Sequence, residues 1–247
     1  YVEYSTYFWE AIAGRTRLGE RIERPDYDGD GKVSFREAHA YTLLASDTID
    51  LPITTSGELL GVESGFRDAE HPDLLPRDMP YSKYIELATP SERAVLEGLS
   101  AQLELQGEDR MLRAERESKP PRSRGRGRSR PVIDDPAGNL RRKIASDIRG
   151  HWPQLANLMN PLAIELVTTR SDEFIRRIEN HPDYNRYREL AVKAKTQLNP
   201  QEKRVKYERF VRVAEIVIRR ENLYRLGDKE TIARYNAIVD IEMGSLD

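Results

Sequence analysis

The sequence predicts a mainly α-helical fold. Apolar residues recur at helical spacing over most of the chain, and several of these segments begin with residues typical of helix N-caps. No segment alternates between apolar and polar residues with the period of two that a half-buried strand requires. The 247 residues suffice for one large domain or two of ordinary size, and a hydrophobic content of 38% provides material for a core.

In the first half of the chain, aromatic residues and capping signals mark the predicted helices. The segment 4–13 is rich in aromatic residues and is expected to be mostly buried. Residues 89–92 form the clearest start signal, and the apolar pattern behind them extends to about residue 117, with Gly107 weakening its middle. The expected helices are 4–13, 34–45, 55–60, a helical turn at 81–87, and 89–117.

The second half is predicted to be helical beyond Pro136. Its longest segment begins with the capping sequence Asn199-Pro200-Gln201-Glu202 and carries an apolar side that extends to Gly227. The expected helices are 140–148, a region 151–168 around two prolines, 172–178, 182–195, 200–226 and 228–243.

A change in composition predicts a linker between two domains. Residues 119–131 read Lys-Pro-Pro-Arg-Ser-Arg-Gly-Arg-Gly-Arg-Ser-Arg-Pro, without an apolar anchor. Such a segment cannot bury enough surface to offset the entropy lost on ordering, so we interpret it as flexible. The alternatives are an arm that binds RNA or an acidic surface, and a site of proteolytic processing. The expected domains are a helical region 1–118, a linker 119–137 and a helical accessory domain 138–247.

Residues 26–37 fit the twelve-residue EF-hand calcium loop at each diagnostic position. Short carboxylates stand at loop positions 1, 3 and 5, and a glycine stands at position 6, where the chain must turn sharply. The glutamate at position 12 can offer both oxygens, which favours calcium over the smaller magnesium ion. The expected ligands of one Ca²⁺ ion are Asp26, Asp28, Asp30, the backbone carbonyl of Lys32, Ser34 and Glu37.

The alternative interpretation of this segment is a surface turn, because Asp and Gly are common in turns. Pro25 disfavours a helical conformation at Arg24, so the helix that enters the loop is expected to be short, displaced or absent. The helix that leaves the loop from Ser34 is expected to be intact. No second loop of this kind occurs in the sequence, which favours structural calcium over a calcium sensor.

Composition argues against several classes of function. The chain has no cysteine, which removes disulfides, thiolate metal sites and a cysteine nucleophile. Its formal net charge of −2 gives no overall attraction to nucleic acid, and no apolar run is long enough to span a bilayer. The four histidines show no metal-ligand spacing, and no phosphate-binding or dinucleotide motif is present. We therefore expect no identifiable catalytic residue in this chain. A single calcium site would be filled most easily in a calcium-rich extracytoplasmic compartment, although the sequence assigns no compartment.

Several motifs near the N-terminus occur in a recognisable order. An aromatic helix ends in Gly14, the calcium loop follows, a helix begins with the pattern S-x-x-E-A at Ser34, and the segment 49–56 comes next. In this order, residues 1 to about 62 resemble the region after the catalytic cysteine in bacterial caspase-like and legumain-like peptidases. The resemblance implies an α/β fold with a His–Cys dyad, of which this chain is the helical C-terminal part. Because the chain has no cysteine, no catalytic residue carries over.

Two main hypotheses of function follow. The first is the calcium-binding C-terminal portion of a peptidase-related protein. In that case either the catalytic half lies upstream as a partner, or the protein is a relative that has lost peptidase activity. The start at Tyr1 without a methionine suggests a fragment. The second is a non-enzymatic, calcium-binding helical adaptor that binds a partner protein. RNA binding through residues 119–131 is a third and less favoured hypothesis, because the run lacks aromatic residues.

Overall fold

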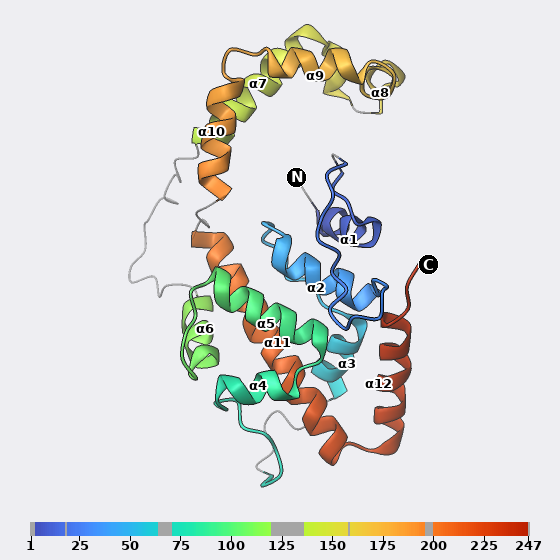
Figure 1. Cartoon of the computed structure of the whole chain (residues 1–247), viewed down its shortest axis with the longest axis vertical. Helices are drawn as coiled ribbons and strands as arrows, with labels where there is room; N and C mark the ends of the chain where they lie inside the picture. Colours follow the sequence, from blue (N-terminus) through green and yellow to red (C-terminus); the bar gives the residue numbers. More distant parts are fainter. Residues whose placement is uncertain are drawn as a thin grey trace. The chain divides into compact units, whose positions relative to one another are not determined.

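The computed structural model describes residues 3–17, 19–63, 71–119, 136–157, 159–195 and 200–246 (Figure 1). Within these ranges the regular structure consists of twelve α-helices and a short 3-10 helix. Their only extended pairing is a single antiparallel bridge between Arg15 and Arg21. The predicted mainly α-helical fold is confirmed. No helix in the described part of the chain is both long enough and apolar enough to cross a membrane.

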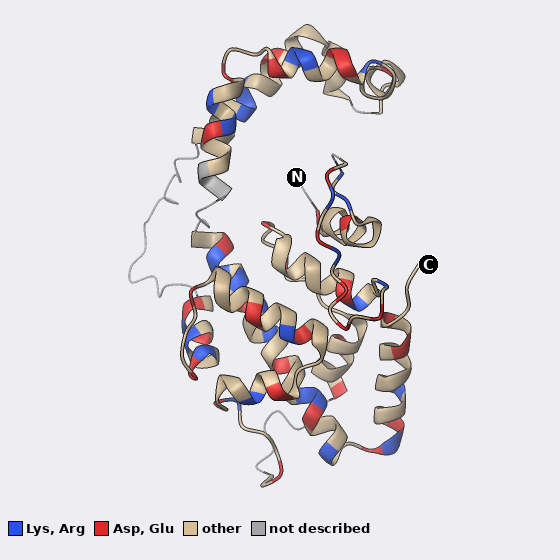
Figure 2. Cartoon of the chain, viewed as in Figure 1, with Lys and Arg blue, Asp and Glu red and all other residues tan. Residues whose placement is uncertain are grey.

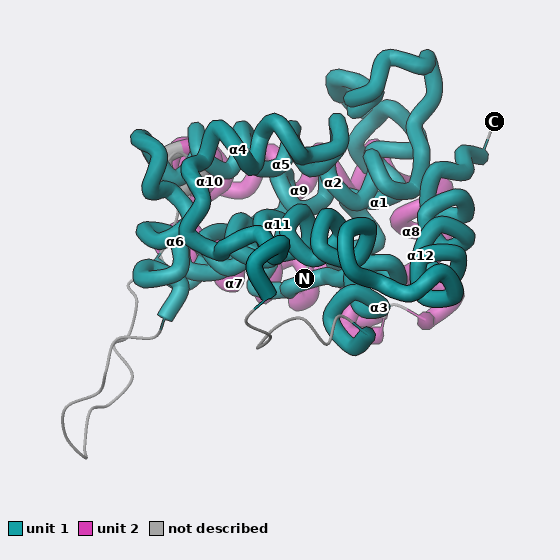
Figure 3. Tube along the Cα trace, turned by 90° about the horizontal axis from the view of Figure 1, so that it is seen from below, with its two compact units in different colours: residues 1–121, 199–247 teal, residues 122–198 magenta. Residues whose placement is uncertain are grey.

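The chain forms two compact units, which Figure 3 distinguishes by colour. Unit 1 comprises residues 1–121 and 199–247, and unit 2 comprises residues 122–198. Unit 1 contains α1 (Tyr4–Ala13), α2 (Phe35–Ala45), α3 (Thr55–Glu63), α4 (Tyr81–Leu87), α5 (Pro90–Gln102), α6 (Arg110–Ser118), α11 (Pro200–Leu226) and α12 (Lys229–Glu242). Unit 2 contains α7 (Pro136–His151), the 3-10 helix η2 (Pro153–Ala156), α8 (Pro161–Thr168), α9 (Ser171–Glu179) and α10 (Tyr184–Lys195).

This division corrects the predicted domains 1–118 and 138–247. Helices α11 and α12 belong to unit 1, because α11 packs against α3, α4, α5 and α6 while α12 packs against α3. The accessory unit therefore ends before α11. Helix α7 begins at Pro136, inside the predicted linker 119–137, and residues 120–135 of that linker lie outside the described residues.

Capping residues set the starts of two helices near the predicted positions. The Ser34 hydroxyl accepts a hydrogen bond from the backbone N–H of Glu37, and the Glu37 carboxylate accepts one from the backbone N–H of Ser34. Thr89 and Glu92 form the same reciprocal pair at the start of α5. Both pairs satisfy N–H groups that have no partner within the helix.

The predicted helix 89–117 is two helices, α5 and α6, separated by residues 103–109. Glu104 and Gly107 both have positive φ angles, of 53° and 86°. A left-handed backbone conformation cannot continue a right-handed helix. Gly107 therefore belongs to a break in the helical path and does not merely weaken one continuous helix.

Arg209 of α11 is 2% exposed and makes most of its hydrogen bonds to backbone carbonyls. Its guanidinium donates to the carbonyl oxygens of Leu43, Ser46, Thr48 and Asp50 at 2.8–3.2 Å. Leu43 lies in the last turn of α2, where carbonyls have no partner within the helix. Because a guanidinium carries five donors in one plane, a single side chain can bind several carbonyls at once. Arg209 thereby fixes the end of α2 and the segment that leaves it.

A buried ion-pair cluster joins three helices of unit 1. Glu92 of α5 accepts a hydrogen bond from Nη2 of Arg36 in α2 at 3.0 Å and another from Nη1 of Arg220 in α11. All three residues are less than 10% exposed. Burial alone would raise the pKa of Glu92, but the two guanidinium groups outweigh it and hold that pKa below its ordinary value. Glu92 is therefore ionised in the folded protein.

Unit 2 has a small core of its own. Ile144 and Ile148 of α7 are buried together with Trp152 and Leu166, and Phe174 of α9 packs against them. The rings of Trp152 and Phe174 have centroids 5.8 Å apart. Helix α7 packs against η2, α9 and α10, and it is therefore the element around which the unit is assembled.

We expect Glu92→Gln to lower the free energy of unfolding by about 3–5 kcal/mol, because it leaves two buried guanidinium groups without a countercharge. Glu97→Gln is the matched control, since Glu97 is exposed on the same helix, and its effect should stay within about 0.5 kcal/mol. Urea unfolding followed by circular dichroism measures both. Equal stability of the two variants would contradict a structural role for the cluster.

The stability difference between wild type and Glu92→Gln is expected to depend on pH. Because the folded-state pKa of Glu92 is lowered, its stabilising contribution is fully present above the ordinary carboxyl value of 4.5 and is lost as the pH falls through the folded-state pKa. The stability difference between wild type and Glu92→Gln should therefore shrink on acidification below about pH 4.5.

Candidate metal centre

The predicted calcium loop lies between α1 and α2, which pack against each other. Ala11 of α1 forms a buried cluster with Val33 and Ala38, with Phe8 and Ile12 packed beside it. The expectation that α1 is mostly buried is wrong, because Ala11 is the only fully buried residue of the helix. The helix contributes one face to the contact and leaves its remaining side chains partly or fully exposed.

No described residue between α1 and α2 is helical, so no helix enters the loop directly. Gly14 ends α1 in the left-handed conformation with a φ of 65°. This arrangement agrees with the effect expected of Pro25, which disfavours a helical residue before it. The helix that leaves the loop, α2, begins at Phe35 with Ser34 as its N-cap.

The three aspartates of the loop converge. One carboxylate oxygen from each of Asp26, Asp28 and Asp30 lies within 4.8 Å of the others. The loop backbone holds these side chains: the carboxylate of Asp26 accepts from the N–H of Gly29 at 2.8 Å and from that of Gly31 at 2.9 Å. Both glycines have positive φ angles, of 77° and 87°, which a side chain would disfavour.

Asp28 and Asp30 are oriented in the same way, each through one oxygen. Oδ1 of Asp28 accepts from the N–H of Asp30 at 3.1 Å, and Oδ1 of Asp30 accepts from the N–H of Lys32 at 2.7 Å. A carboxylate has lone pairs for about four acceptor contacts, so each aspartate keeps capacity for a cation. Three negative groups this close repel one another, and a bound cation would relieve that repulsion.

Glu37 is not part of the converging group. Oε1 accepts from the backbone N–H of Tyr27 at 2.6 Å and of Asp28 at 3.2 Å, while Oε2 accepts from the N–H and the hydroxyl of Ser34, both at 2.9 Å. The residue is 1% exposed. In this conformation Glu37 ties the start of the loop to the start of α2, and its acceptor capacity is used within the protein.

The predicted ligands therefore divide into two sets. The aspartates at loop positions 1, 3 and 5 each place one carboxylate oxygen within 4.8 Å of the other two. Ser34 is 5% exposed and directs its hydroxyl to Glu37, and Lys32 contributes its backbone N–H to Asp30. A cation held by all six predicted ligands would require Glu37 to exchange some of its hydrogen bonds for bonds to the ion.

The C-terminal segment contacts the helix that follows the loop. The backbone N–H of Phe35, the first residue of α2, donates to the carbonyl of Gly244 at 3.0 Å. Glu242, the last residue of α12, accepts from the backbone N–H of Ser56 at 2.9 Å and from its hydroxyl at 2.6 Å. The end of α12 is thus joined to the starts of both α2 and α3.

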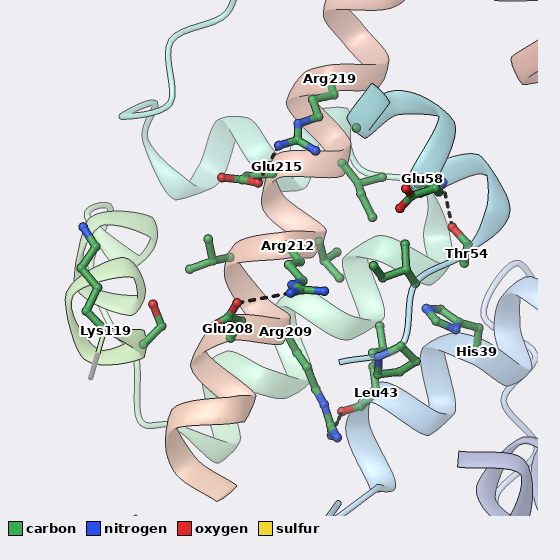
Figure 4. A pocket seen from close by; sticks show the side chains of 18 residues that line it. His39, Leu43, Thr54, Glu58, Lys119, Glu208, Arg209, Arg212, Glu215 and Arg219 are labelled. Atoms are coloured by element: carbon green, nitrogen blue, oxygen red, sulfur yellow. Dashed lines mark hydrogen bonds and ion pairs between the residues drawn. The ribbon is translucent and has the colours of Figure 1, made fainter. Parts of the chain in front are cut away.

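A pocket of about 530 Å³ opens beside α2, between α3 and α11 (Figure 4). His39 lines it, and its Nδ1 is 2.9 Å from the hydroxyl of Tyr4. Burial, reinforced by the charges of Arg36 and Arg209, lowers the pKa of His39 to about 4. Burial, followed by the charge of Glu242, raises the pKa of Tyr4 to about 12. Both groups are therefore uncharged near neutral pH.

The remaining polar groups of the pocket are mostly paired. Arg209 is bound to backbone carbonyls, Arg219 donates to Glu215 at 3.0 Å, and Arg212 makes a longer contact of 3.4 Å with Glu208. The sequence interpretation treated the four histidines alike and missed this pocket. Because Tyr4 and His39 are 35 residues apart, no local pattern could have identified their pairing.

No protein-family model, curated protein or solved structure matches this chain.

Proposed function

We propose that the chain binds one calcium ion in the loop 26–37 and that the ion stabilises unit 1. The convergence of Asp26, Asp28 and Asp30 supports this proposal most directly. Oxygen donors at short spacing suit a hard cation, and the absence of cysteine is in keeping with an all-oxygen site. In the proposed complex the aspartates supply carboxylate oxygens, Lys32 its carbonyl, Ser34 its hydroxyl or a bridging water, and Glu37 its carboxylate.

The position of the loop supports a structural role for the ion. The loop lies beside the contact between α1 and α2 and leads into the first turn of α2. Arg36 in that turn belongs to the ion-pair cluster with Glu92. A cation that neutralises the aspartates would make this turn more stable without changing the helices on either side. A sensor would instead need a second conformation that calcium favours, and the sequence contains no partner loop.

We also propose that unit 1 is related to the caspase-like and legumain-like peptidases and follows their catalytic half. The resemblance of residues 1–62 is the only support for this relationship. A His–Cys pair encoded upstream in the same reading frame would support it. An upstream sequence without that pair would favour the second candidate function, a non-enzymatic helical adaptor, for which unit 2 offers a groove described below.

Calcium that binds only the folded protein should raise its melting temperature. At a calcium concentration of 100 times Kd, linkage gives a stabilisation of about 2.7 kcal/mol. We expect thermal melts to shift upward with calcium, to return with a chelator, and to respond less to magnesium because the glutamate at position 12 favours the larger ion. Identical melts under all three conditions would contradict calcium binding.

Asp28→Asn and Asp30→Asn test the aspartates as ligands. Asparagine retains an oxygen that can accept the loop N–H but removes the charge that attracts the ion. We expect calcium affinity to fall by tenfold or more, about 1.4 kcal/mol, while calcium-free stability stays equal or rises slightly, because one of three repelling charges is removed. Glu23→Gln makes the same change at an exposed position just before the loop and should leave affinity unaltered. Isothermal titration calorimetry distinguishes these results.

Glu37→Gln tests whether Glu37 is a calcium ligand or only accepts the hydrogen bonds that connect the loop to the start of α2. Because Glu37 is buried and accepts four hydrogen bonds, its replacement should lower calcium-free stability by about 1–3 kcal/mol and also abolish the calcium-dependent shift. Loss of stability with calcium binding unchanged would show that Glu37 is only structural. In that case the assigned ligand set would be wrong.

A further inference from the structure

One stripe of α7 combines an apolar centre with a cation at each end. Arg141, Ile144, Ala145, Ile148 and Arg149 follow the spacing i, i+3, i+4, i+7 and i+8, which places them on one side of a helix. All five line the same cavity, whose volume is about 410 Å³. Ile144 and Ile148 form its floor with exposed fractions of 6% each, while Ala145 and both arginines are exposed.

The opposite wall of this cavity comes from α9 and α10. Phe174 and Ile178 lie one turn apart on α9, and Tyr184 and Tyr187 lie at i, i+3 on α10. The whole cavity lies within unit 2 and is an open apolar groove bounded by three helices, with Leu155 also lining it. We call these residues the α7 groove.

The described residues of unit 2 carry more basic than acidic side chains. Residues 136–195 contain 11 Lys and Arg residues against 7 Asp and Glu residues, a formal charge of +4. Figure 2 shows Lys and Arg distributed along α7 and α10. Within the described residues, Arg141 and Arg149 form no ion pair, in contrast to the neighbouring Lys143, which binds Asp183 at 2.6 Å.

We propose that the α7 groove binds an amphipathic helix of a partner protein, with apolar residues on one face and acidic residues near both ends. The apolar face would cover Ile144 and Ile148, and the acidic ends would pair with Arg141 and Arg149. Eight residues of α-helix correspond to about 12 Å, so the two cations are separated by about two turns. An anionic lipid with a single headgroup would engage one of these ends and leave the other without a counterion.

The test uses the full chain and a synthetic, fluorescently labelled peptide of about four helical turns. The peptide carries leucines at i, i+4 spacing and glutamates at both ends, and a second peptide carries lysines in place of the glutamates. We expect fluorescence anisotropy to show binding of the acidic peptide, with an affinity that decreases as salt is added, and no binding of the basic peptide.

Two variants locate the binding site, and one controls for charge. Arg141→Glu/Arg149→Glu should weaken binding by about tenfold or more, through lost attraction and added repulsion. Ala145→Glu should weaken it similarly by placing a carboxylate on the groove, at an exposed position that tolerates a good helix former. Arg142→Glu/Arg177→Glu makes the same charge change at exposed positions outside the groove and should bind like wild type.

Absence of binding of the acidic peptide would overturn the proposal. Equal weakening by the groove variants and the control variant would also overturn it, because it would indicate nonspecific charge attraction. Oleate is the lipid probe. Binding of oleate but not of the acidic peptide would assign the groove to a lipid and would also overturn the proposal. Circular dichroism of each variant checks that the helical content is unchanged, and because all five substituted positions are exposed we expect it to be.

Discussion

The ion pairing of Glu92 with Arg36 and Arg220 is the interaction on which the arrangement of unit 1 depends. It brings α2, α5 and α11 to a common point, although these helices are far apart in the sequence. Apolar contacts tolerate small shifts of one helix along another, whereas a buried charge left without its partner costs several kcal/mol. The cluster therefore contributes specificity: few alternative packings of these helices would satisfy all three charges.

Helix α2 is held at both ends by such polar contacts, and this affects the proposed calcium loop. Arg36, one residue before Glu37, is fixed by the ion-pair cluster, and Arg209 binds the carbonyls at the opposite end. The glutamate of loop position 12 therefore belongs to a helix whose position does not depend on a cation. In the proposed calcium complex the backbone of α2 would already be in place, and only the loop and the Glu37 side chain would have to rearrange.

The sequence predicted those features that depend on neighbouring residues. Ser34 with Glu37 and Thr89 with Glu92 set helix starts through contacts three residues apart, and the convergence of three aspartates follows from their alternate spacing and two glycines. It could not predict features that depend on distant partners. The sequence pattern showed that α11 has an apolar side. It did not show that α5 and α6 cover this side, so the sequence-based prediction placed α11 in the wrong domain. Buried Arg209 resembles a surface arginine until its carbonyl partners are known.

Because unit 2 lies within the chain of unit 1, the order of synthesis separates parts that must meet. Helices α5 and α6 leave the ribosome before the 77 residues 122–198, and α11 follows them. At typical rates of translation this delay lasts roughly 4–15 s, which is long compared with the folding of a small helical unit. Unit 2 can thus fold first, while the apolar faces awaiting α11 remain open to chaperones or to aggregation. Slow translation of residues 122–198 would prolong that exposure.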